Sequence, residues 1–206
     1  MTIPKVLGRT SSINVRKVLW TLDELDLAYE REDWGAGFSS TRDPAFLALN
    51  PNALVPVLVD DRGALWESNT ICRYLATDTP LLPRDRRARA IVEQWMDWQA
   101  TELNTAWRYA FAGLVRKFPG FEDPAQIAAS IEAWNTAMGL LDARLVDTGA
   151  YVAGETFTLA DIVLGLATHR WLHSPITRVE WPALTAYYDR LKQRPAFAAW
   201  SLPRVP

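Results

Sequence analysis

The sequence contains a single cysteine and carries almost no net charge. Its 206 residues include 22 lysines and arginines against 24 aspartates and glutamates, which leaves a net charge of −2. One cysteine excludes an intrachain disulfide and fits a reducing compartment, so we expect a cytoplasmic protein. The near balance of charge gives no reason to expect nucleic acid or an anionic membrane as a partner.

Long apolar runs are also missing. No stretch approaches the roughly 20 apolar residues that a bilayer-spanning helix needs. The first residues, Met1 to Lys5, lack a cationic segment followed by an apolar core, so no secretory signal is expected. Hydrophobic residues make up 49% of the chain and charged residues 22%, values of an ordinary globular protein rather than a disordered one. We therefore expect one large domain or two small ones, each with its own core.

The first 80 residues mix short strands with helices. Strands are expected at 4–8, 29–34, 55–60 and 64–66, with one helix after the first strand and another from Glu67. The helix between the first two strands makes a βαβ unit and implies parallel pairing. Residues 35–48 form a loop with at most a helical turn. The resulting βαβ–ββα order is thioredoxin-like and defines an α+β domain at residues 1–78.

Beyond a proline-containing linker at residues 79–86, no strand pattern recurs. Asp123 suits a helix N-cap, Pro124 the first helical position, and Gly149 the end of the same helix. Thr158 with Asp161 three residues later approximates a capping box before a helix that is apolar on every side. Residues 87–206 are therefore expected to form an all-helical domain.

The stretch from Asn50 to Leu75 carries the strongest functional signal. Pro56 cannot donate to a β-ladder, so it belongs at an edge or a bend, and Val55 before it can offer its main chain to an extended peptide. The helix that begins beside Glu67 and Ser68 offers unpaired N–H groups and positive dipole character to a carboxylate. Together these features predict a slot for a short, anionic, amino-acid-like ligand.

This stretch resembles the glutathione-binding signature of the glutathione transferase family, in which a cis proline precedes a Glu-Ser helix. The matching positions are Asn50, Pro51, Val55, Pro56, Leu58, Glu67, Ser68, Ile71, Tyr74 and Leu75. Two positions depart from the pattern. Ala53 stands where the family usually has glycine, and Leu54 where a polar residue often contacts the ligand. The Thr158–Asp161 start and the final helix also resemble the family, so the likeness spans nearly the whole chain.

The resemblance implies a role for each residue of the slot. The main chain of Val55, between Leu54 and Pro56, would pair with the cysteinyl unit of glutathione. Ser68 and the helix N-terminus would hold the γ-glutamyl carboxylate, and Glu67 would hold the γ-glutamyl amine. Glutathione would thus be the co-substrate, and because family members are usually two-fold dimers, a homodimer is expected.

Catalysis of this kind requires the thiolate of glutathione. A free thiol has a pKa near ~8.5, so donors close to the sulfur must stabilise the anion at neutral pH. The natural place is the turn between the first strand and the first helix, where Ser11, Ser12 and Asn14 lie. Ser12 and Asn14 resemble a bacterial Thr-x-Asn pattern and are the predicted donors, with Ser11 as the alternative. Ser and Asn are also favoured at helix N-caps for purely structural reasons.

The second substrate is expected on the first long helix of the helical domain. Trp107, Arg108 and Phe111 can line an apolar pocket there, although the same aromatics suit a helical core equally well. Cys72 lies in mid-helix and is interpreted as core. His169 and His173 have the spacing of a metal pair, but no third ligand is near in sequence, so no metal is expected.

Three functions remain open. The first is transfer of glutathione to small apolar electrophiles, or its use to reduce a peroxide. The second is a non-catalytic interaction or assembly protein built on the same fold. The third, a weaker option, is reductive dehalogenation or isomerisation of a specific metabolite. Glutathione is the only small-molecule partner that the residues suggest apart from the electrophile.

Overall fold

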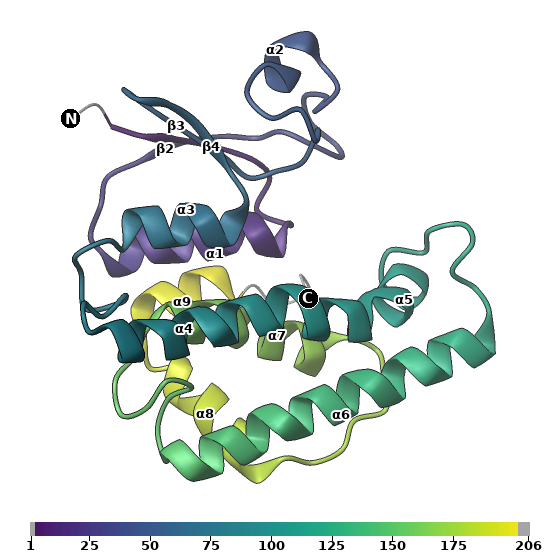
Figure 1. The fold of residues 1–206 in the computed structure, drawn as a ribbon. Helices are drawn as coiled ribbons and strands as arrows, with labels where there is room; N and C mark the ends of the chain where they lie inside the picture. Colours follow the sequence, from purple (N-terminus) through teal and green to yellow (C-terminus); the bar gives the residue numbers. More distant parts are fainter. Residues whose placement is uncertain (1–2, 202–206) are drawn as a thin grey trace. The chain divides into compact units, whose positions relative to one another are not determined.

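The computed structural model of the chain describes residues 3–201. The chain divides into two compact units, Met1–Leu82 and Pro83–Pro206 (Figure 1). Each unit has its own core and is described by itself. The first combines a sheet with helices and the second is helical, which confirms the predicted combination of a thioredoxin-like α+β domain with an all-α domain.

A four-stranded mixed sheet organises the first unit. Its strands are β1 (Lys5–Leu7), β2 (Glu30–Glu32), β3 (Val57–Asp60) and β4 (Gly63–Trp66), in the order β2-β1-β3-β4. β1 pairs parallel to β2 and antiparallel to β3, as the βαβ–ββα pattern predicts. The prediction that the third strand opens at Val55 was two residues early. Pro56 has no N–H to give to the ladder, and β3 begins only after it.

Two helices cover one face of this sheet. α1 (Ile13–Glu24) and α3 (Ser68–Leu75) pack side by side beneath the strands (Figure 1). The opposite face carries a cluster formed by Leu7, Val57 and Phe46. Phe46 belongs to α2 (Pro44–Leu47), the single helical turn expected in the 35–48 loop, and the carboxylate of Asp43 caps this turn by accepting from the N–H of Ala45.

The second unit consists of helices joined by short loops. Its elements are α4 (Arg86–Trp98), a π-helical turn (Gln99–Leu103), α5 (Asn104–Leu114), α6 (Pro124–Thr148), α7 (Leu159–His173), α8 (Pro182–Leu191) and α9 (Pro195–Trp200). The segment from residue 86 to 116 is therefore two α-helices with a π-helical turn between them. Across residues 3–201, no helix is both long and apolar enough to span a membrane.

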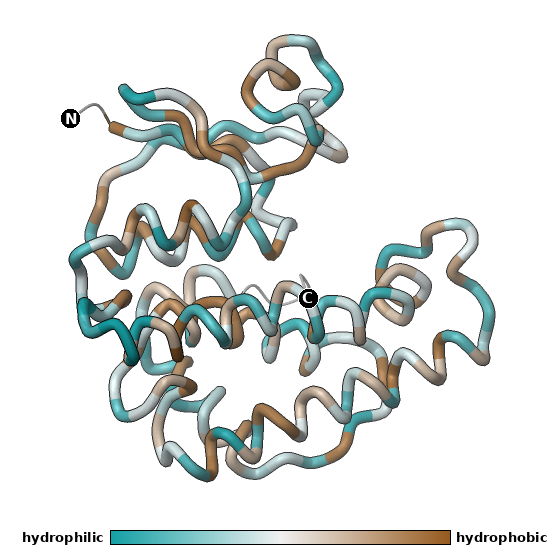
Figure 2. Tube along the Cα trace, in the orientation of Figure 1, coloured by the Kyte–Doolittle hydropathy of each residue, from teal (hydrophilic) through white to brown (hydrophobic). Residues whose placement is uncertain are grey.

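Local signals set the bounds of α6, and burial distinguishes α7 from it. α6 begins where Asp123 accepts hydrogen bonds from the N–H groups of Ala125 and Gln126, and it ends at Gly149 with φ 73°. The tube in Figure 2 alternates between hydrophobic and hydrophilic colours along α6. α7 is different, because its residues from Leu159 to Trp171 are all buried, as its apolar sequence predicts. It is the central helix of this unit.

Candidate functional site

The peptide bond between Val55 and Pro56 is cis, as the resemblance implies. Pro56 is buried, whereas Val55 is half-buried and Leu54 points 62% of its surface to solvent. Within residues 3–201 neither the N–H nor the C=O of Val55 makes a hydrogen bond. The main chain here therefore has a donor and an acceptor available to an extended ligand, two residues before the first residue of β3.

The turn before this bond is built by Asn50. Its side-chain amide donates to the carbonyl of Leu54 at 2.7 Å, and its side-chain oxygen accepts from the N–H of Asn52 at 3.0 Å. Asn50 is only 2% exposed, so these bonds are shielded from water. Ala53 has φ 55°, the left-handed region that glycine adopts without strain. The alanine that replaces the family's glycine at this position therefore strains the backbone, whereas the hydrogen bonds of the turn are kept.

The start of α3 lies beyond β4 and carries the acid–hydroxyl pair. Glu67 is the N-cap, with φ 71° and no hydrogen bond from its side chain to the helix, and it is exposed. Ser68 is the first helical residue and is 6% exposed. The side chains of Glu67 and Ser68 have no partner among the described residues. Together with the N–H groups of the first turn, they form an unfilled set of polar groups at a helix N-terminus.

The turn between β1 and α1 contains the predicted thiolate donors. Ser12 is the N-cap of α1, yet its hydroxyl makes no capping hydrogen bond. Asn14, in the first turn of α1, is half-buried, and its amide has no partner among residues 3–201. The purely structural explanation for a serine here is that its side chain caps the helix. The geometry does not support that explanation, because the Ser12 hydroxyl makes no hydrogen bond to the N–H groups at the start of α1.

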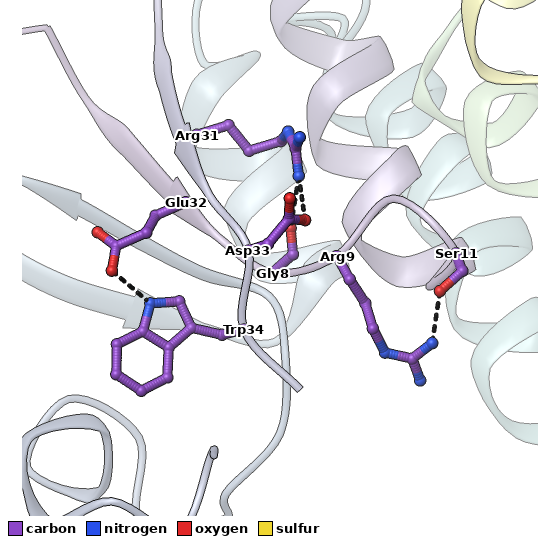
Figure 3. A network of polar contacts seen from close by, with 7 residues as sticks. All are labelled: Gly8, Arg9, Ser11, Arg31, Glu32, Asp33 and Trp34. Atoms are coloured by element: carbon purple, nitrogen blue, oxygen red, sulfur yellow. Dashed lines mark hydrogen bonds and ion pairs between the residues drawn. The ribbon is translucent and has the colours of Figure 1, made fainter. Parts of the chain in front are cut away.

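Ser11 is in a different situation. Its hydroxyl oxygen accepts a hydrogen bond from a terminal nitrogen of Arg9 (Figure 3). The same turn is tied to the segment after β2, because the N–H of Gly8 donates to the carbonyl of Glu32 at 2.8 Å and the N–H of Arg9 to that of Trp34 at 3.2 Å. Ser11 is therefore part of the framework of the turn, which makes it a weaker candidate than Ser12 for the principal donor.

Gly8 brings this turn against the slot. It has φ 149°, and a Cβ atom added there would lie 2.5 Å from a methyl of Val15 and 3.0 Å from the Cβ of Val55. Only a residue without a side chain fits at such a distance. Gly8 thus lets the β1–α1 turn and the cis-proline turn touch, which places the predicted donors and the predicted main-chain edge in one region of the first unit. Sequence reasoning gave no role in the site to Gly8 or Arg9, although a glycine at the end of the predicted strand was a usable signal.

Cys72 has the environment of a core residue. It is 1% exposed, and the hydroxyl of Thr21 donates to its sulfur at 3.3 Å. Burial raises the pKa of the Cys72 thiol to about 11, so the group stays protonated and poorly nucleophilic at neutral pH. The prediction that this cysteine is structural is confirmed.

The two histidines of α7 lie next to each other, with ring centroids 4.3 Å apart. Nδ1 of His169 lies 2.8 Å from the hydroxyl of Tyr188, and His169 is 1% exposed. Across residues 3–201, no group of three histidine, cysteine, aspartate or glutamate side chains could hold a metal ion. The pair is better explained as a polar contact between α7 and α8.

The predicted second-substrate residues lie on α5 of the second unit. Trp107 is half-buried, Arg108 is exposed and Phe111 is 5% exposed. The guanidinium carbon of Arg170 lies 4.6 Å from the ring centroid of Trp107 and 4.1 Å from that of Phe111. These two aromatics therefore pack around a buried cation of α7, which is a more polar setting than a simple apolar wall. Their role in binding a substrate stays a prediction.

Comparison with known proteins agrees with this geometry. Residues 11–78 match the family model "Glutathione S-transferase, N-terminal domain", and residues 124–190 match "Glutathione S-transferase, C-terminal domain". The chain is 40% identical to "Glutathione S-transferase GstB" of Escherichia coli (strain K12) over 200 residues, covering 92% of this chain and 93% of that protein. The chain belongs to the glutathione transferase family.

Two further relatives of the family are informative. The glutathione-bound crystal structure of the theta class glutathione S-transferase from Xanthomonas axonopodis pv. citri superposes with a TM-score of 0.90 at 39% identity and covers 98% of each chain. "Elongation factor 1-gamma 2" of Oryza sativa subsp. japonica is 30% identical over 167 residues, which are 77% of this chain and 38% of that protein. The family architecture thus also occurs inside a longer protein of a different name.

Proposed function

We propose that this glutathione transferase conjugates glutathione to small apolar electrophiles and that Ser12 and Asn14 stabilise the attacking thiolate. The observation that carries the proposal is the hydroxyl of Ser12, which stands at the N-cap of α1 without capping it. A donor at a helix N-terminus, where the dipole is positive, is suited to a developing anion. The amide of Asn14 in the first turn of the same helix supplies a second donor.

The slot would hold glutathione by three kinds of contact. The unpaired main chain of Val55, beside Leu54 and the cis Pro56, would pair with the cysteinyl unit in the manner of an added strand. The N–H groups at the start of α3 and the hydroxyl of Ser68 would take the γ-glutamyl carboxylate. The exposed carboxylate of Glu67 would take the γ-glutamyl amine. The relative from Xanthomonas, solved with glutathione bound, supports this ligand.

In the reaction, the thiol first loses its proton to solvent water. The thiolate sulfur then forms a bond to the electrophilic carbon, and the leaving group departs with the electron pair of the bond that breaks. Each unit by which the site lowers the thiol pKa corresponds to about 1.4 kcal/mol of preference for the anion. Trp107, Arg108 and Phe111 would contact the electrophile. We also propose that the protein is a homodimer, as family members usually are. Analytical ultracentrifugation would test this oligomeric state.

Binding is tested first. Glu67→Ala and Ser68→Ala should each weaken glutathione binding at least about tenfold in calorimetry, because each removes a charge-assisted or buried hydrogen bond. Thr70→Ala, an exposed position on the same helix, is the matched control and should bind normally. Unchanged affinity in both Glu67→Ala and Ser68→Ala would contradict the slot.

Chemistry is tested by ultraviolet titration of the thiolate in the glutathione complex. Ser12→Ala and Asn14→Ala should each raise the pKa of the bound thiol, and Ser40→Ala, in an exposed loop, should not. If neither Ser12→Ala nor Asn14→Ala changes that pKa, the assignment of the donors is wrong. Assays with an aryl chloride and with an organic hydroperoxide separate conjugation from peroxide reduction. Glutathione binding without turnover of either would favour a non-catalytic role, for which the likeness to elongation factor 1-gamma is an argument.

A further inference from the structure

Arg9 occupies the centre of the β1–α1 turn. Its N–H donates to the carbonyl of Trp34 at 3.2 Å, and its own carbonyl accepts from the N–H of Ser12 at 3.1 Å. Its side chain turns back so that a terminal nitrogen donates to the hydroxyl of Ser11 (Figure 3). The residue is therefore held on both sides by main-chain bonds, one of which reaches the N-cap residue of α1.

The guanidinium of Arg9 is partly withdrawn from water and has no counter-ion in the described part of the chain. Its Nε is buried without a hydrogen-bond partner. Gly35 makes room for it, since a Cβ at that position would lie 3.3 Å from Nε and 3.7 Å from Cδ of Arg9. Among residues 3–201, no carboxylate lies within 4.0 Å of this guanidinium. Arg31, in the same network, is instead paired with Asp33.

A cation that residues 3–201 leave without a carboxylate partner has a direct consequence for an anion formed nearby. Transfer of a charge out of water is unfavourable unless a partner of opposite sign is present. Residues 3–201 supply no such partner to Arg9, while the hydroxyl that Arg9 contacts belongs to Ser11, the residue next to Ser12. A thiolate at the Ser12 hydroxyl would meet the positive field of Arg9, and an opposite charge within about 4–6 Å favours the charged form of a group by about 1–3 pKa units.

We propose that Arg9 is a positioning residue of the glutathione transferase reaction: it holds Ser11 in the turn and supplies the positive charge that favours the bound thiolate. The proposal rests on the proposed function, because it assumes that the glutathione sulfur lies at the Ser12 turn. Arg9 need not touch the substrate. It acts through Ser11 and through its field.

The test compares variants that remove the charge with one that keeps it. Arg9→Gln should raise the pKa of glutathione bound to the enzyme by about one unit, and the rate of conjugation should fall about tenfold at a pH below the thiol pKa of the parent complex. Raising the pH by about one unit should recover most of that rate. Arg9→Lys keeps the charge and should retain a thiol pKa close to that of the parent protein. Arg9→Met keeps the aliphatic stem beside Gly35 and replaces Arg9→Gln if the glutamine variant does not fold.

The matched control is Arg62→Gln. Arg62 is exposed in the β3–β4 turn, at the end of β3 that is far from the cis proline. The substitution Arg62→Gln therefore removes the same charge as Arg9→Gln, but away from the site. It should leave the thiol pKa unchanged. An equal pKa shift in Arg62→Gln and Arg9→Gln would overturn the proposal, because it would reflect net charge alone.

Two failures are distinguishable. If the unmodified enzyme does not bind glutathione in calorimetry, or binds it without lowering the thiol pKa, the proposed function itself fails. If the unmodified enzyme does both, and the folded charge-removing variant keeps glutathione affinity and the same thiol pKa, then only the role of Arg9 is wrong. A lost rate that higher pH does not recover, with an unchanged thiol pKa, would likewise show a structural role and overturn the proposal.

Discussion

Within residues 3–201, two α-helices have a hydroxyl residue at the N-cap, Ser12 for α1 and Thr158 for α7, and these two N-caps differ in their hydrogen bonds. At the start of α7, the carboxylate of Asp161 accepts from the N–H of Thr158 at 2.8 Å and from its hydroxyl at 3.2 Å. It also accepts from the N–H of Val152 at 2.9 Å and from the hydroxyl of Tyr187 at 3.2 Å. At the start of α1, the hydroxyl of Ser12 caps nothing.

The difference separates a structural helix end from a site. A closed end satisfies its own donors and stabilises the buried helix, so it has nothing to offer a ligand. An open end forgoes that stabilisation and keeps donors for a partner that arrives later. The start of α3 follows the second pattern, because Glu67 makes no side-chain capping bond there.

The largest expected effect is at the closed end. Asp161→Ala would leave the buried donors of Thr158, Val152 and Tyr187 without their acceptor, and each orphaned donor costs about 1–3 kcal/mol. We expect the free energy of unfolding to fall by about 4 kcal/mol in urea denaturation. Glutathione affinity of the fraction that remains folded should be unchanged. A loss below about 1 kcal/mol would mean that the closed end contributes little.

The same residue makes stability depend on pH. Burial raises the pKa of Asp161 from 3.8 to about 6, although its four donors act in the opposite direction. Since the folded-state value lies above the unfolded one, the contribution of Asp161 to stability is fully present below pH ~4 and is lost as pH rises through about 6.

Comparing the parent protein with the Asp161→Asn variant isolates the pH dependence of stability that is due to Asp161. The unfolding free energy of the parent protein minus that of Asp161→Asn should decrease by about 2 kcal/mol between pH ~4 and pH ~7. The difference between the two proteins cancels the titration of the other carboxylates. A constant difference across this range would show that Asp161 titrates at an ordinary value.

A smaller effect is expected beside the open ends, at Ala53. This residue has φ 55°, and glycine adopts that conformation without the strain of a Cβ. Ala53→Gly should therefore raise the free energy of unfolding by about 0.5–1 kcal/mol, after the greater flexibility of the unfolded chain is taken into account. Chemical denaturation measures it. The control Ala28→Gly, at a residue with negative φ, should be destabilising instead.

The smallest effect on stability is expected at the open end itself. Replacing a serine that caps a helix costs about 1 kcal/mol, but the Ser12 hydroxyl caps nothing. Ser12→Ala should therefore change the free energy of unfolding by less than about 0.5 kcal/mol. A loss near that of an ordinary cap would show that the hydroxyl stabilises α1 after all, and the contrast with α7 would disappear.

Much of the fold was predictable because its signals are local. The cap at Asp123, the terminal Gly149 and the carboxylate of Asp161 all act on residues within a few positions of themselves. The βαβ–ββα order follows from the spacing of strands and helices. The errors were also local, as with the start of β3, because a residue before proline can look like a strand without joining the ladder.

The candidate site was predictable only as a set of residue types. Val55, Pro56, Glu67 and Ser68 could be named from spacing and from resemblance, and the cis bond was expected. The sequence did not show whether a hydroxyl at a helix N-cap makes a hydrogen bond within the protein. Ser12 and Thr158 are equivalent as sequence signals, yet only the folded structure shows that one is bonded to Asp161 and the other is not.

The amino-acid sequence by itself determined where α6 begins and ends and where α7 begins, because capping and turn preferences depend on neighbours along the chain. Only the tertiary structure decided that Gly8 touches Val55 and Val15 and that Arg9 turns back onto Ser11. The physical reason is that contacts between distant residues depend on how strands and helices pack. Which hydrogen-bond donors of a side chain stay unpaired is therefore known only when the positions of the surrounding residues are known.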